Sequence, residues 1–228
     1  MVESYRFDSF CVLEKKDDKK YFAILSLFFD EKIERNLIQK GSKGEVWKVR
    51  HDGVCYALKI NRPTNKIIGR KVKALLKGSY FSSLILRVDK ARAEGCFSMC
   101  DVYLVAEKKH FRFARESFVL MEWIDGPLLS DSEELRNKYK NEVGDLLKNL
   151  HQHGISSGDV HPGNFIVSNA GLKIIDLSGR GASAIDQAKD FIGLKNKFGV
   201  EADVDSWAVS LVLLRSKLRA FLKKAKVS

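Results

Sequence analysis

Residues 159–164 of this chain read DVHPGN, and residues 176–179 read DLSG at the end of an apolar run. These stretches supply two carboxylates, Asp159 and Asp176, and one side-chain amide, Asn164, at the spacing used for phosphoryl transfer to a hydroxyl. Asp159 is expected to face the attacking hydroxyl as the base. Asn164 and Asp176 are expected to hold the Mg²⁺ ions that neutralise nucleotide phosphates. The alternative is a turn between two strands, because Asp, Asn, Gly and Pro all favour turns.

Apolar periodicity divides the chain at about residue 125 into a strand-rich part and a helix-rich part. The strands expected before this point, with one helix at 79–94, cover residues 33–39, 45–50, 54–60, 102–106 and 118–124. After it, helices are expected at residues 135–150, 184–197 and 205–224. Two short strands are also expected there, at 165–167 and 172–175. Ser130, together with Glu133, is expected to cap the first of these helices.

This order of elements, together with the two polar stretches, predicts an α+β, two-lobed protein-kinase-like fold. The predicted N-lobe is β-rich and covers residues 1–124, where it binds the nucleotide. The predicted C-lobe is mostly helical and covers residues 125–228, where it carries the catalytic loop, the metal-binding residues and a basic C-terminal helix.

Three features of the N-lobe are candidates for binding ATP. Gly41 and Gly44 lie between two strands, where backbone N–H groups can approach phosphate oxygens, although a plain hairpin turn explains them as well. Lys59 interrupts an apolar strand and is expected to meet a phosphate; the alternative is an edge strand with this lysine in water. The carbonyl of Glu122 and the amide of Ile124 are the expected adenine contacts, unless they only end a buried strand.

Two questions stay open at the level of the sequence. His161 either orients Asp159 or a metal ligand, or it is a structural histidine. Lys59 in a kinase needs a carboxylate on the helix that follows, and the nearest acids are Asp89 and Glu94, neither of which the sequence assigns to it.

Composition limits the class of protein. The chain has 228 residues, a net charge of +11 and a pI of about 9.4, which favours anionic partners. Its four cysteines form no Cys-x-x-Cys pair, so neither a disulfide framework nor a zinc site is expected. Residues 1–10 lack a signal-peptide pattern, and the apolar run at 21–29 is shorter than the roughly 20 residues of a membrane span. We expect a cytoplasmic protein, soluble or peripheral to a membrane.

The segment 206–228 contains no acidic residue and reads as a basic amphipathic helix. Its basic and apolar residues alternate as Leu211, Leu214, Arg215, Lys217, Leu218, Arg219, Phe221, Lys223, Lys224 and Lys226. One interpretation is a closing core helix with a solvated face. The other is contact with an anionic membrane surface, to which each basic residue contributes on the order of 1 kcal/mol. Both hold if the apolar stripe packs on the lobe while the lysines face headgroups.

Residues 77–95, 164–168 and 174–179 resemble the lipopolysaccharide core heptose(II) kinases of Gram-negative bacteria, and the resemblance covers nearly the whole chain. Ser157-Gly158-Asp159 stands where most protein kinases carry His-Arg-Asp, which fits this glycolipid branch. The resemblance implies ATP- and Mg²⁺-dependent phosphorylation of a heptose of the lipopolysaccharide inner core. It also implies an anionic glycolipid acceptor and work at the cytoplasmic face of the inner membrane.

Other functions are compatible with the sequence. One is an atypical kinase acting on another sugar, such as the core keto-octulosonic acid, or on protein. A second is a pseudokinase that binds partners, favoured by the unassigned acid partner of Lys59 and opposed by the intact Asp159, Asn164 and Asp176. A third is a nucleic-acid binder, suggested by the charge and by the FRF sequence at 111–113. No RNA- or DNA-binding motif is present, so we expect no nucleic-acid partner.

Overall fold

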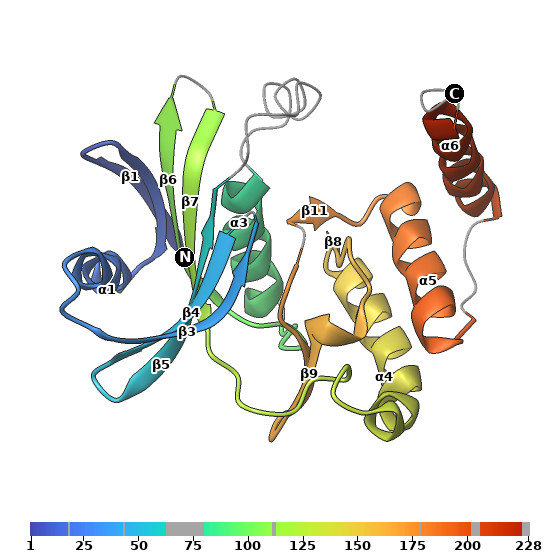
Figure 1. Cartoon of the computed structure of the whole chain (residues 1–228), viewed down its shortest axis with the longest axis horizontal. Coiled ribbons are helices and arrows are strands. Elements are labelled where there is room, and N and C mark those ends of the chain that lie inside the picture. Colours follow the sequence, from blue (N-terminus) through green and yellow to red (C-terminus); the bar gives the residue numbers. More distant parts are fainter. Residues whose placement is uncertain are drawn as a thin grey trace. The chain divides into compact units, whose positions relative to one another are not determined.

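The computed structural model describes residues 1–17, 19–42, 44–62, 80–110, 113–177, 179–201 and 206–224. The chain divides into two compact units, Met1–Asp125 and Gly126–Ser228 (Figure 1). Strands dominate the first unit and helices the second, which confirms the predicted α+β class. Within the stretches that carry the family resemblance, residues 77–79 and Ser178 lie outside the described residues, and so does Lys43 of the glycine turn.

The first unit is built on a seven-stranded antiparallel sheet with the order β1-β2-β6-β7-β5-β4-β3. The strands are β1 Val2–Phe7, β2 Phe10–Lys15, β3 Glu34–Gly41, β4 Gly44–His51, β5 Val54–Asn61, β6 Val102–His110 and β7 Phe113–Glu122. Its described helices are α1 Lys20–Phe29 and α3 Tyr80–Ala93. The strands expected at 33–39, 45–50, 54–60, 102–106 and 118–124 and the helix expected at 79–94 are all present, with ends that differ by up to five residues.

Alternation along the strands gives the sheet two buried faces. Leu58, Leu104 and Leu120 point to one face, where they join the buried Phe22 and Leu25 of α1 in one apolar core. The other face packs against α3, whose Leu84, Ile85, Val88 and Ala91 are buried. Lys59 of β5 lies between Leu58 and Ile60, which belong to this core, and therefore points toward the side of α3.

The second unit contains α4 Glu133–Gln152, α5 Ala184–Phe198 and α6 Ser206–Lys224. Two antiparallel strand pairs accompany the helices: β9 Phe165–Ser168 with β10 Gly171–Ile174, and β8 Ile155–Ser156 with β11 Arg180–Gly181. The predicted helices and the longer strand pair are confirmed to within two residues, but the β8–β11 pair was not predicted. Ser132 rather than Ser130 caps α4, because its side chain accepts the Leu135 N–H at 3.0 Å.

The outer face of α6 differs from the expected arrangement. Within α6, Ala208 is buried, whereas Trp207, Leu214 and Leu218 are exposed. Of the four residues of the expected apolar stripe, Leu214 and Leu218 thus face outward and Leu211 is partly buried, whereas the side chain of Phe221 lies outside the described residues. No helix among the described residues has both the length and the apolar character to cross a membrane.

Leu25→Ala tests the contribution of α1 to the sheet core. Leu25 is 0% exposed and Leu86, on the outer side of α3, is 51% exposed. Leu25→Ala should lower the free energy of unfolding by about 3 kcal/mol, because it removes buried methyl groups and leaves a cavity. The matched Leu86→Ala should change it by less than about 0.5 kcal/mol. Urea denaturation followed by circular dichroism measures both, and equal losses in the two variants would contradict the packing described.

Candidate functional site

The loop that begins at Asp159 is closed by hydrogen bonds of its own. Nδ2 of Asn164 donates to the carbonyl oxygen of Asp159 at 2.9 Å, and the Asn164 N–H donates to the carbonyl oxygen of His161 at 2.8 Å. Nδ1 of His161 accepts from the Gly163 N–H at 3.1 Å, and Pro162 starts a single 3₁₀ turn, η1 Pro162–Asn164. Asp159 and Asn164 are thus held in one short turn that His161 caps.

The strand leading to Asp176 is attached to the same turn. The N–H of Ile175, the residue before Asp176, donates to the carbonyl oxygen of Asn164 at 2.9 Å. The hairpin of β9 and β10 forms the connection between the two segments. The structure therefore brings Asp159, Asn164 and Asp176 into one region of the second unit, and both aspartates are exposed there.

The donor set of this region suits Mg²⁺. Because Nδ2 of Asn164 is used within the loop, its amide oxygen is the group that can face a cation. Mg²⁺ prefers oxygen ligands and usually takes one or two from protein while keeping waters and phosphate oxygens. One amide oxygen and the Asp176 carboxylate fit that requirement. Among the described residues no group of three or more His, Cys, Asp or Glu side chains is arranged to hold a metal, so a closed protein cage is not formed there.

A buried carboxylate on α5 fixes the segment in front of Asp159. Asp190 accepts the N–H groups of Ser157 and Gly158, each at 2.8 Å, and lies 2.9 Å from Nε2 of His151. Asp190 is buried, so these contacts satisfy a charge that would otherwise be costly. Gly158 has a φ of 78°, a left-handed conformation that suits glycine just before Asp159.

Sequence reasoning missed Asp190 and His151. The signal was present, because Asp190 interrupts the apolar face that Ala188, Phe191 and Leu194 form on α5. An acid at a core-facing helix position needs a buried partner. Its backbone partners lie 32 and 33 residues earlier in the chain, however, and no local pattern identifies them.

The two candidate phosphate-binding glycines differ in their surroundings. A side chain at Gly44 would overlap the backbone carbonyl of Ile60 on the neighbouring strand, so strand packing alone requires glycine there. At Gly41 the nearest atom to an added Cβ is the Gly44 carbonyl oxygen at 3.8 Å. Among the described residues, packing therefore gives no reason for glycine at position 41, and its small size leaves room for another group.

Lys59 lies in the interior of the sheet, because β5 pairs with β4 on one side and with β7 on the other. The alternative of an edge strand with this lysine in water is therefore wrong. Lys59 is half-buried and lies opposite Val119 on β7. Ser117, two residues from Val119, lies opposite Glu107 on β6, so Lys59 and Glu107 point to the same face.

The carboxylates on the α3 side of the sheet are distributed as follows. Asp89 lies 3.7 Å from Nζ of Lys15, and Glu94 lies 3.7 Å from Nζ of Lys90. Glu107 is buried, and the Ser82 hydroxyl on α3 donates to it at 3.4 Å. The two acids named from the sequence thus face other lysines, whereas the buried carboxylate on the face of Lys59 comes from a strand, where sequence reasoning did not look.

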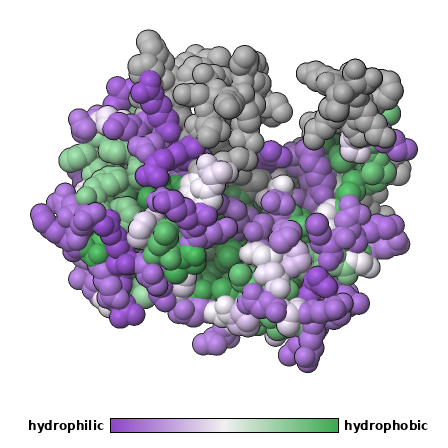
Figure 2. Space-filling view, in the orientation of Figure 1, coloured by the Kyte–Doolittle hydropathy of each residue, from purple (hydrophilic) through white to green (hydrophobic). Residues whose placement is uncertain are grey.

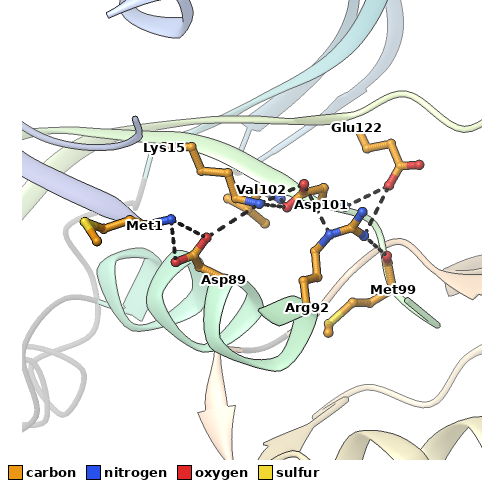
Figure 3. A network of polar contacts seen from close by, with 8 residues as sticks. All are labelled: Met1, Lys15, Asp89, Arg92, Met99, Asp101, Val102 and Glu122. Carbon is orange, nitrogen blue, oxygen red and sulfur yellow. Dashed lines mark hydrogen bonds and ion pairs between the residues drawn. The ribbon is translucent and has the colours of Figure 1, made fainter. Parts of the chain in front are cut away.

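The side chain of Glu122 belongs to a polar network that links α3 to the end of β7 (Figure 3). Its Oε2 accepts the Asp101 N–H at 3.0 Å and lies 3.9 Å from Arg92. Asp101 in turn pairs with Lys15 at 2.6 Å and with Arg92 at 3.2 Å. Because Asp101 is buried, these contacts hold the start of β6 and the end of β7 together at the strand that leads to Ile124.

A second cluster follows directly after Glu122. Nε1 of Trp123 donates to Oδ1 of Asp125 at 2.7 Å, and the ammonium of Lys48 lies 3.6 Å from the same oxygen and 4.4 Å from the Trp123 ring. The hydrogen bond from Trp123, and then the charge of Lys48, hold the pKa of the Asp125 carboxyl below its usual value. The segment around Ile124 is therefore bound on both sides to ordered side chains of the first unit.

Comparison with known proteins identifies close relatives. A family model described as lipopolysaccharide core biosynthesis protein (WaaY) matches residues 1–228. The chain is 34% identical over 229 residues to a lipopolysaccharide core heptose(II) kinase WaaY of Escherichia coli strain K12, which covers 99% of this chain and 98% of that protein. A second Escherichia coli protein of the same name is 32% identical over 231 residues, covering 99% of each.

A protein kinase also shows similarity. Human serine/threonine-protein kinase greatwall is 28% identical over 150 residues, which covers 61% of this chain and 15% of that protein. Together with the β-rich first unit and the helical second unit, this similarity confirms the predicted protein-kinase-like fold.

Replacing Asp190 tests how the loop before Asp159 is held. Asp190→Asn leaves only one acceptor oxygen for the Ser157 and Gly158 N–H groups, so the free energy of unfolding should fall by about 3 kcal/mol. Hydrogen exchange at these two amides should accelerate more than exchange at amides elsewhere in α5. The control is Asp145→Asn on α4, whose carboxylate is exposed. Unchanged exchange at both amides in Asp190→Asn would refute the anchoring role.

Replacing Asp101 tests the network around Glu122. Asp101→Asn removes the carboxylate that pairs with Lys15 at 2.6 Å and with Arg92 at 3.2 Å, and leaves the longer contacts of these cations with Asp89 and Glu122. The free energy of unfolding should therefore fall by about 2 kcal/mol. The matched control is Asp30→Asn, which removes an exposed ion pair with Lys32 and should cause no measurable change. Chemical denaturation at low and high salt measures both, and a loss for Asp101→Asn no larger than that of the control would show that the network adds nothing to stability.

Proposed function

Because the chain belongs to the WaaY family of lipopolysaccharide core biosynthesis proteins, we propose that it phosphorylates a heptose of the lipopolysaccharide inner core, using ATP and Mg²⁺. It is thus a phosphotransferase with an alcohol group as acceptor. The observation that carries this proposal is the convergence of Asp159, Asn164 and Asp176 in one hydrogen-bonded region of the second unit. This is the set of groups that phosphoryl transfer to a hydroxyl needs.

Each residue of the second unit has a proposed role. Asp159 accepts a hydrogen bond from the heptose hydroxyl and orients its oxygen toward the γ-phosphorus. It takes the proton as the new oxygen–phosphorus bond forms and the bond from the γ-phosphorus to the bridging oxygen breaks, with ADP as the leaving group. Asn164 and Asp176 hold Mg²⁺, which when bound offsets the negative charge of the phosphates. His161 shapes the turn through its Nδ1 contact with Gly163. Positioning of the hydroxyl and the phosphates supplies most of the rate enhancement, because phosphoryl transfer requires little covalent chemistry from the protein.

The nucleotide is assigned to the first unit. Lys59 carries its charge on an interior strand, where it binds an α- or β-phosphate. Gly41 and Gly44 form the turn whose N–H groups approach the phosphates, and the space that the described residues leave around a Cβ at Gly41 supports this use. The carbonyl of Glu122 and the amide of Ile124 contact adenine, which is consistent with a Glu122 side chain already engaged by the Asp101 N–H. The first 124 residues thus form the N-lobe, and residues 125–228 the catalytic C-lobe.

The acceptor is an anionic glycolipid, and the net charge of +11 favours its approach. We place the protein in the cytoplasm, at the inner-membrane face, where residues 206–228 make peripheral contact with the membrane surface. Nucleic acid is not a partner in this proposal. A pseudokinase that binds partners without catalysis is the competing function. Catalysis of transfer decides between the two.

The decisive experiment combines purified chain, ATP, Mg²⁺ and delipidated core oligosaccharide lacking the phosphate, with the product read by mass spectrometry. Wild-type chain should add one phosphate to one heptose, and a generic protein substrate should gain none. Core oligosaccharide from cells with and without this protein should show the same difference of one phosphate. No phosphate on any core sugar, despite ATP binding, would support the pseudokinase instead.

Asp159→Ala should reduce kcat by about a thousandfold or more, since it removes the group that orients and deprotonates the hydroxyl. The Kd for Mg²⁺-ATP should change by less than roughly threefold, because Asp159 has no proposed contact with the nucleotide. Asp145→Ala, at an exposed position of α4, serves as the control and should match the wild type. Near-normal transfer by Asp159→Ala would refute the assignment.

A further inference from the structure

An apolar stripe covers the outer surface of α6. Trp207, Leu214 and Leu218 are 58%, 64% and 57% exposed. At about 100° per residue, Leu214 and Leu218 lie on either side of Trp207 around the helix axis, each within roughly 20° of it. We call these three residues the α6 stripe. In Figure 2, apolar surface shows at the right of the view, where Figure 1 draws α6, with hydrophilic surface beside it.

Basic side chains border the stripe. Arg215 and Lys217 are exposed and lie on opposite sides of it, each about 80° away around the helix. No acidic residue occurs between 206 and 224. The outer surface of α6 therefore combines an apolar centre with positive flanks, the distribution of helices that lie in the interface of an anionic bilayer.

A different part of the α6 surface, about 100° around the helix from Trp207, is already used. Ala208 is fully buried, and α6 packs against α5 within the second unit. The helix therefore does not need the α6 stripe to attach to its own unit. Large apolar side chains that are aligned on an exposed helix contact water, and a partner can cover this apolar surface.

Charge decides which partner fits. A second copy of this chain would bring Arg215 and Lys217 near their own counterparts, and like charges repel. An anionic lipid surface attracts both residues while its acyl region takes up the α6 stripe. We propose that α6 lies in the plane of an anionic bilayer, with Trp207, Leu214 and Leu218 in the interfacial region and the flanking basic residues at the headgroups.

The effect of membrane binding on catalysis rests on the proposed function. A lipid-linked acceptor stays in the membrane, so an enzyme held at the same surface meets it at a higher effective concentration. The α6 stripe should therefore lower the apparent KM for an acceptor embedded in vesicles. It should leave both kcat and KM unchanged for delipidated core oligosaccharide, which has no membrane.

The first test uses the unmodified chain with vesicles of phosphatidylglycerol and phosphatidylethanolamine, and with neutral phosphatidylcholine vesicles as the comparison. The chain should sediment with the anionic vesicles. Its affinity for the neutral vesicles should be lower by about tenfold or more, because the basic flanks lose their anionic partners. Brominated acyl chains should quench Trp207, measured as the quenching that a Trp207→Tyr variant loses. Equal binding to both vesicle types, or no quenching of Trp207, would overturn the proposal.

The second test compares matched variants. Leu214→Ser combined with Leu218→Ser should weaken vesicle binding about tenfold or more and raise KM for the embedded acceptor by a similar factor. Leu86→Ser combined with Phe97→Ser changes two equally exposed apolar residues of the first unit and should leave both quantities unchanged. Thermal unfolding of each variant confirms that it is folded.

The outcomes separate this inference from the proposed function. If the wild-type chain transfers phosphate to neither acceptor, the proposed function is wrong, whatever the vesicle data show. If it phosphorylates the delipidated acceptor while the α6 double variant binds vesicles like the wild type, the inference about α6 is wrong and the function stands. Dimers seen by light scattering that disappear in the double variant, without vesicle binding by the wild type, would assign the stripe to a second copy and overturn the proposal.

Discussion

The second unit depends on one buried carboxylate. Asp190 lies in the core of that unit and binds two consecutive N–H groups, those of Ser157 and Gly158, together with His151. A buried anion is tolerated only when its lone pairs are used, so the position of α5 and the conformation before Asp159 determine each other. The turn through Asn164 and the strand end before Asp176 then follow by short-range hydrogen bonds.

The first unit is held together by helix packing on its sheet and by a network of charged side chains. Its sheet is covered on both faces, by α1 over the leucines of the core and by α3 over the face of Lys59. Charge on the α3 side is concentrated in the network of Lys15, Arg92, Asp101 and Glu122. That network lies next to the strand end assigned to adenine. The proposed nucleotide contacts thus come from a rigid sheet rather than from a long loop, which favours a fixed geometry.

Periodicity and turn chemistry predicted most elements of the fold, because strands and amphipathic helices leave local patterns. They did not predict the pairing of β8 with β11, which is two residues long, or the bonds of Asp190, which span more than 30 residues. The convergence at Asp159, Asn164 and Asp176 followed from motif spacing. The direction of the apolar residues of α6 did not, since periodicity identifies an apolar face without saying whether it points inward or outward.

We propose that Asn164 and Asp176 share a metal ion with bound nucleotide. The most direct measurement replaces Mg²⁺ by paramagnetic Mn²⁺ and follows the backbone amide signals of residues 159–177 by nuclear magnetic resonance. With ATP present, Mn²⁺ should selectively broaden the signals of Asn164 and Asp176 and their neighbours, and Asp176→Asn should weaken that effect. Broadening confined to other parts of the chain, or independent of ATP, would contradict the account.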